Sequence, residues 1–167
     1  HEIVDAWNVP RPVQSKLPLM IGGQGEKKTF RMAAQYADML NTTASHADLP
    51  HKLSVLQQHL DDFGRARSSI NVTCHSHLVV AEDNAGLRDR LQMMLSARGM
   101  DMSLADDVER LRALIGRALM GTPEQIIDQV SALRATGLDG VTVAIASGPH
   151  DLDHVALAGR TLQAAFA

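Results

Sequence analysis

Short apolar segments alternate with helix-length segments along almost the whole chain, and this alternation limits the possible folds most strongly. Four runs rich in apolar residues read as strands: Leu19–Ile21, Met39–Thr42, Ile70–Val80 and Val141–Ala146. Strands that are separated by helices form a parallel sheet. The runs carry few polar interruptions, which is typical of strands that are covered on both faces. The sequence therefore predicts an α/β protein with about four βα units.

The segments between these strands carry helix start and stop signals. Asp48 and Pro50 open a helix that ends before Gly64, because aspartate is a good N-cap and proline fits the first helical turn. Thr122-Pro123-Glu124-Gln125 combines an N-cap, a first-turn proline and a capping-box glutamine. The predicted helices are 26–37, 50–63, 85–97, 104–119, 123–136 and 151–166. We expect one domain over residues 1–167, with residues 1–16 as a connector.

Composition argues against several classes of function. The net charge is −3 and the pI is about 6.2, so we expect no nucleic-acid partner and no anionic membrane surface. No apolar run approaches the roughly 18 residues of a membrane span, and no secretory signal opens the sequence. The single Cys74 excludes an internal disulfide. The expected location is cytoplasmic.

A glycine-rich turn joins the first predicted strand to the first predicted helix. Glycines let the backbone approach a ligand closely, and a helix start presents N–H groups to it. Charge and a hydroxyl donor follow within one helical turn. The residues of this candidate phosphate site are Gly22, Gly23, Gly25, Lys27, Lys28 and Thr29. An ordinary strand–turn–helix corner without a ligand is the alternative, since short motifs carry many false positives.

Five segments, taken in order, resemble one known family. They are Ala6–Gln14 (AWNVPRPVQ), Ile21–Thr29 (IGGQGEKKT), Ala33–Asp38 (AAQYAD), Gly121–Gln125 (GTPEQ) and Ala135–Val141 (ATGLDGV). The set resembles the C-terminal half of the luciferase-like monooxygenases, and most closely the subgroup that depends on coenzyme F(420). The resemblance implies a TIM-barrel fold and a deazaflavin F(420) or FMN cofactor. It also implies that the 22–29 loop holds the cofactor phosphate, with Asn41 and Thr42 near the cofactor or substrate.

Four βα units are only half of a TIM barrel, which typically needs about 250 residues. A half-barrel has two open sheet edges, which invite pairing with another chain, and we expect an apolar inner face. We therefore expect a fragment of a longer oxidoreductase, and a first residue His1 rather than methionine agrees. The parent reaction would be hydride transfer or oxygen activation on a small organic substrate. The partner would be a missing N-terminal half or a second copy, and an inactive self-associating half-barrel is the alternative function.

A His-x-His pair on the third strand supports a different reading. His75 and His77 are two residues apart, so their side chains point to the same face of a strand. Such pairs ligate metals in barrel hydrolases, which makes a metal-dependent hydrolase the second alternative. Further ligands would come from His150, Asp151, Asp153 and His154. The other interpretation is a pair of polar residues that line a pocket.

Overall fold

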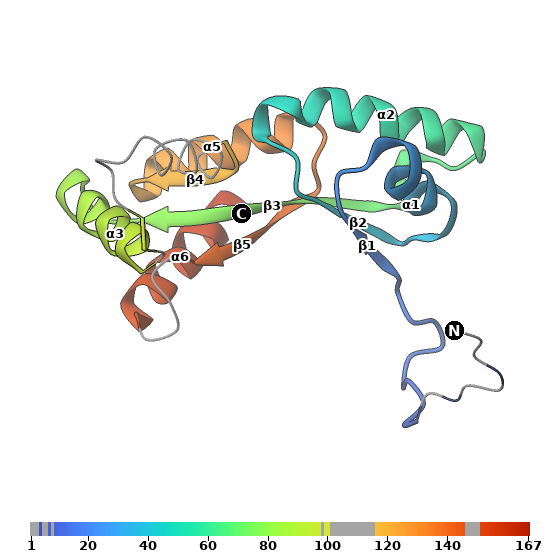
Figure 1. Ribbon diagram of the computed structural model, residues 1–167, viewed down its shortest axis with the longest axis horizontal. Helices are drawn as coiled ribbons and strands as arrows, with labels where there is room; N and C mark the ends of the chain where they lie inside the picture. The colour runs from blue at the N-terminus through green and yellow to red at the C-terminus, as the bar shows by residue number, and fades with distance from the viewer. Residues whose placement is uncertain (1–3, 5–6, 8, 98, 101–115, 146–150) are drawn as a thin grey trace.

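The computed structural model describes residues 4, 7, 9–97, 99–100, 116–145 and 151–167. Along the chain the elements are β1 (Met20–Gly22), η1 (Glu26–Phe30), α1 (Arg31–Tyr36), β2 (Met39–Thr42), η2 (His46–Asp48), α2 (Leu49–Asp62), η3 (Arg67–Ser69), β3 (Asn71–Val80), α3 (Asn84–Ser96), β4 (Ala118–Gly121), α5 (Pro123–Ala135), β5 (Gly140–Ile145) and α6 (Leu152–Ala165). Strands and helices alternate, as the sequence predicts, and every strand pair is parallel. Residues 9–19, which precede β1, extend away from the body of the molecule (Figure 1).

The strand register shows which strands form the continuous part of the sheet. β3 pairs with β2 through residues 71–74, with β5 through 73–78 and with β4 through 77–80. Because the stretch that pairs with β5 overlaps both of the others, β2 and β4 lie one after the other along the same edge of β3. The unbroken arc is therefore β1–β2–β3–β5. These four strands are the four predicted ones, and β4 is an additional short strand.

The predicted helix over 104–119 is wrong at its C-terminal end. Ala118 and Leu119 belong to β4, which continues to Gly121 and pairs with the last four residues of β3. Residues 104–115 of that prediction lie outside the described residues. Four residues are too few to distinguish a strand period from a helix period. Pairing with the long third strand decides the conformation, and no local pattern reveals it.

One face of the sheet packs against the helices. The buried side chains of β3 on this face are Val72, Cys74, Ser76, Leu78 and Val80, each fully shielded from solvent. They join apolar residues of α1, α2, α5 and α6 in a single core, in which Leu56, Leu60, Ile126 and Val130 are fully buried. Figure 1 shows α1, α2 and α5 along the same side of the sheet. Burial of these apolar side chains is the main stabilising contribution to the fold.

The opposite face, which would be the inner face of a barrel, is polar at its centre, where Asn41, Thr73 and Thr142 lie side by side with the histidines of β3, so the prediction of an apolar inner face is wrong there. It carries five half-buried polar side chains, namely Asn41, Thr73, His75, His77 and Thr142. In β3 the odd-numbered positions 71–77 are polar or aromatic and the even-numbered ones are buried. Alternation of this kind is expected when one face of a strand is covered and the other is not. Among the described helices, α3 packs on this face near the end of β3, where Val79 contacts Met94 and Leu95.

One buried and one half-buried histidine, His154 and His46, predict a pH dependence of stability. His154 is fully buried on α6 and its Nε2 accepts a hydrogen bond from the Val80 N–H at 3.1 Å. Desolvation lowers the pKa of His154, with a further decrease from Arg90, and desolvation also lowers the pKa of His46. The unfolded chain therefore takes up protons that the folded chain resists, so the free energy of unfolding falls as the pH decreases below the ordinary value of 6.5.

Urea unfolding between pH 7.5 and 5 measures this effect. Each histidine contributes at most about 1.4 kcal/mol per pH unit. The His154→Gln variant keeps an acceptor for Val80 but does not titrate, so its slope should be smaller than that of the wild type. Carboxyl groups whose pKa values are lowered, such as those of Asp38 and Asp151, act at lower pH and leave this window clear. Equal slopes in the two proteins would contradict the assignment to His154.

Candidate functional site

The glycine-rich turn follows β1 at the carboxyl end of the sheet. Gly23 has a φ of +135°, a backbone conformation that residues other than glycine rarely adopt. Its N–H donates to the Asn41 carbonyl oxygen at 3.0 Å. A Cβ atom on Gly23 would lie 3.2 Å from Thr29 Cγ2, and one on Gly25 would lie 3.0 Å from Thr29 Oγ1. The Thr29 side chain therefore approaches both glycines closely, and Gly23 is restricted further by its positive φ.

The helix that follows begins with a wide turn. Residues Glu26–Phe30 are π-helical, and the Phe30 N–H donates to the Gly25 carbonyl oxygen at 3.0 Å. They continue directly into α1. π-helical turns are rare in proteins, and those that do occur are often found at functional sites. The first N–H groups of a helix have no acceptor within the helix, and the exposed Lys27 and Lys28 add positive charge to the same turn.

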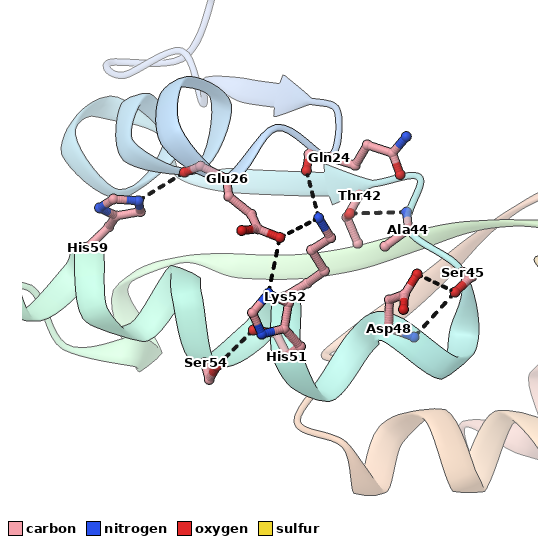
Figure 2. Close-up of polar contacts among 10 residues, drawn as sticks. All are labelled: Gln24, Glu26, Thr42, Ala44, Ser45, Asp48, His51, Lys52, Ser54 and His59. Atoms are coloured by element: carbon pink, nitrogen blue, oxygen red, sulfur yellow. Dashed lines mark hydrogen bonds and ion pairs between the residues drawn. The ribbon is translucent and has the colours of Figure 1, made fainter.

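Side chains of α2 hold this turn in place (Figure 2). Lys52 Nζ donates to Glu26 Oε1 at 2.6 Å and to the Gln24 carbonyl oxygen at 3.3 Å. His51 Nε2 lies 3.2 Å from the same Glu26 oxygen, and His59 Nε2 lies 2.9 Å from the Glu26 carbonyl oxygen. The hydrogen bond from Lys52 lowers the pKa of the Glu26 carboxyl group. The position of the turn therefore depends on α2, and the Lys52 charge is already paired with a carboxylate.

Sequence reasoning missed these contacts. Glu26 and Lys52 belong to consecutive βα units, and the contact depends on how α2 packs beside η1 and α1. Neither residue stands in a motif with fixed spacing. The sequence offers only a weak signal for this contact. It consists of a lysine in the first turns of the next predicted helix and an acidic residue directly after the glycine-rich turn.

Asn41 links the turn to the inner face of the sheet. Its carbonyl oxygen holds Gly23, and its side-chain Oδ1 accepts hydrogen bonds from Thr73 Oγ1 and Thr142 Oγ1, each at 3.1 Å. The register places Gly22, Asn41 and Thr73 side by side on three neighbouring strands. The structure therefore brings one predicted strand-end residue, Asn41, next to the predicted turn.

Thr42 lies differently. Its side chain is only 1% exposed and faces the helices, where Oγ1 accepts a hydrogen bond from the Ala44 N–H at 3.3 Å. The structure thus separates the side chain of Thr42 from that of Asn41, although sequence reasoning grouped the two. Successive side chains of a strand point to opposite faces, so only one of them lies on the inner face.

The structure does not bring the predicted metal ligands together. The His75 and His77 rings are 5.9 Å apart between centroids. His154 accepts the Val80 N–H, while Asp151 caps α6 and pairs with Arg90. His150 lies outside the described residues, and within the described part of the chain no three metal-ligating side chains form a group. His75 instead hydrogen-bonds through Nδ1 to Thr142 Oγ1 at 3.3 Å.

Comparison with known proteins supports the resemblance seen in the sequence. The profile of the luciferase-like monooxygenase family matches residues 1–140. The F420-dependent tetrahydromethanopterin reductase of Methanopyrus kandleri superposes with a TM-score of 0.66 at 18% identity, over 90% of this chain and 51% of that one. Riboflavin lyase with modified FMN superposes with a TM-score of 0.62 at 17% identity, over 86% and 43%. The uncharacterized protein Rv0953c of Mycobacterium tuberculosis is 35% identical over 52 residues, 31% of this chain and 18% of that protein.

The comparison with solved structures confirms the predicted half-barrel. The chain spans about half the length of the luciferase-like barrels that it matches, and its four-stranded parallel arc with outer helices is the corresponding half. No helix in the described segments has the length and apolar character needed to cross a membrane.

Proposed function

This chain belongs to the luciferase-like monooxygenase family, and we propose that it forms the phosphate-binding half of a flavin- or deazaflavin-dependent oxidoreductase. The observation that carries the proposal is the turn at Gly22–Gly25, with its positive φ at Gly23 and a helix directly after it. A cradle that a Cβ would fill, unpaired helix N–H groups and two exposed lysines fit a phosphate group. FMN and the deazaflavin coenzyme F(420) both carry one.

The residues have distinct roles in this proposal. The Gly23 N–H is engaged by the Asn41 carbonyl oxygen, so the backbone N–H groups after Gly23 and Gly25 donate to phosphate oxygens, and the Thr29 hydroxyl is a further donor. Lys27 and Lys28 supply charge near the helix start. When bound, the ring system supplies the hydride transfer or oxygen activation on a small organic substrate. The contribution of this chain is to hold and orient the phosphate-bearing end of the cofactor.

A complementing N-terminal half is the proposed partner. The chain covers 51% of the M. kandleri reductase and 43% of riboflavin lyase, so a full barrel requires as many strands again. Among the described strands, β1 pairs with β2 alone, and its other edge is flanked by the exposed side chains of Leu19 and Met20. The polar inner face does not favour self-association driven by apolar burial alone. The other half would then supply most of the ring pocket and substrate pocket.

Native mass spectrometry with FMN and with F(420) tests the proposal. We expect one cofactor per chain, displaced by inorganic phosphate and weakened at high salt, because the contact is electrostatic. The double variant Lys27→Glu, Lys28→Glu should bind at least about tenfold more weakly, since each reversed charge repels the phosphate. An oligomer that takes up neither cofactor, alone or with the complementing half, would favour the inactive self-associating half-barrel.

A further inference from the structure

The inner face of the sheet beside the turn carries a connected, uncharged hydrogen-bond cluster. It consists of Asn41, Thr73, His75 and Thr142. Within the described strands, no lysine, arginine, aspartate or glutamate has its side chain on this face, by the register of the ladder. The turn, in contrast, is followed by two lysines. The two neighbouring regions therefore differ in the ligand chemistry that they suit.

The hydrogen-bond directions in the cluster follow from counting protons. A threonine hydroxyl has one proton to donate, and both hydroxyls, Thr73 and Thr142, donate theirs to Asn41 Oδ1. The Thr142 oxygen can then only accept from His75 Nδ1, which lies 3.3 Å away. The proton of the neutral imidazole is thereby assigned to Nδ1, because the hydrogen bond made by one ring nitrogen sets the state of the other.

This arrangement leaves two groups to interact with a ligand. His75 Nε2 carries a lone pair, and no partner for it occurs among the described residues. The Asn41 amide nitrogen, with two N–H donors, points away from the hydroxyls that Oδ1 engages. The cluster thus offers one acceptor and one donor group without net charge. A neutral group is favoured there, since an anion or cation would lose its hydration without a counter-charge.

We propose that this cluster is a binding subsite for a neutral organic group that bears an O–H or N–H donor, with His75 Nε2 as the acceptor. The inference rests on the proposed function, in which Asn41 joins this subsite to the phosphate-binding turn through its bond to Gly23. A ligand that spans both regions has an anionic end at the turn and a neutral, hydrogen-bonding part on the sheet.

The first test is the tautomer of His75, measured by ¹H–¹⁵N correlation of the imidazole nitrogens. We expect the wild type to carry its proton on Nδ1. Thr142→Val is nearly isosteric and removes the acceptor, so it should shift His75 toward the Nε2–H tautomer. Thr161→Val is the matched control, because Thr161 bonds to the Leu157 carbonyl oxygen within α6 and lies outside the cluster. An Nε2–H tautomer in the wild type would overturn the inference.

The second test is binding of three neutral probes: riboflavin, phenol and anisole. Riboflavin and phenol carry donors and should shift the His75 Nε2 signal, whereas anisole has no donor and should not. Thr142→Val and His75→Phe should weaken phenol and riboflavin about three- to tenfold, as expected for one lost hydrogen bond. An unchanged His75 signal with both donor-bearing probes would refute the subsite.

Inorganic phosphate separates this inference from the proposed function. Phosphate should perturb the Gly23 amide and leave His75 unchanged. Loss of phosphate binding with retained phenol binding would refute the phosphate-binding turn alone. Retained phosphate binding with loss of phenol binding would refute the subsite alone.

Discussion

Replacing Gly23 with valine is expected to lower the affinity for FMN or F(420) by at least about a hundredfold. Gly23 has a φ of +135°, and a Cβ there would lie 3.2 Å from Thr29 Cγ2. A β-branched residue in this conformation introduces backbone strain of about 1–3 kcal/mol. The turn can relieve this strain only by changing its conformation. Movement would break the bond from the Gly23 N–H to the Asn41 carbonyl oxygen and displace the donors for the phosphate. Fluorescence titration of the cofactor measures the loss.

Gly64→Val is the matched control for this variant. Gly64 also has a positive φ, +61°, but a Cβ there meets nothing within 4 Å. It lies after α2, away from the turn. We expect it to lower the free energy of unfolding by about 1–2 kcal/mol with unchanged cofactor affinity. If Gly23→Val binds within threefold of the wild type while Gly64→Val does too, the turn is not the phosphate site.

The turn and its flanking elements were predictable because their determinants are local. An apolar run, three glycines and a helical period all lie within one short stretch, and the structure places β1, the turn and the helix there. The family resemblance, which rests on this stretch together with four other segments in order along the chain, is confirmed. The contacts of Lys52 and His59 to Glu26 and its carbonyl oxygen were not predictable, since they depend on how two helices pack.

The polar inner face was visible in the sequence but was misread. In β3 the residues Thr73, His75 and His77 alternate with buried ones, which is the two-residue period of a strand with one covered face. Treating the whole strand as an apolar run concealed this alternation. The bonds from Thr73 and Thr142 to Asn41 join three strands, so their register had to be known first. β4 was missed because its conformation comes from pairing with β3.

Replacing Met20 with proline is expected to weaken association with the complementing half by at least about tenfold. In β1, the Leu19 carbonyl oxygen accepts from the Met39 N–H and the Gly23 N–H donates to the Asn41 carbonyl oxygen. Backbone groups of alternate residues point to opposite edges of a parallel strand. The Met20 N–H therefore faces the free edge, where proline removes a donor and its ring obstructs pairing. Analytical ultracentrifugation of the chain with an N-terminal half supplied in trans measures the association.

Ile21→Pro is the matched comparison one residue further along. The Ile21 backbone faces β2 by the same alternation, and its side chain packs against the core. Proline there should break the β1–β2 ladder and lower the free energy of unfolding by about 3 kcal/mol, whereas Met20→Pro should change it by less than about 1 kcal/mol, since an edge position tolerates proline. Undiminished association of a folded Met20→Pro chain would show that the free edge of β1 does not join the other half. Barrel closure would then have to be sought at the β5 edge.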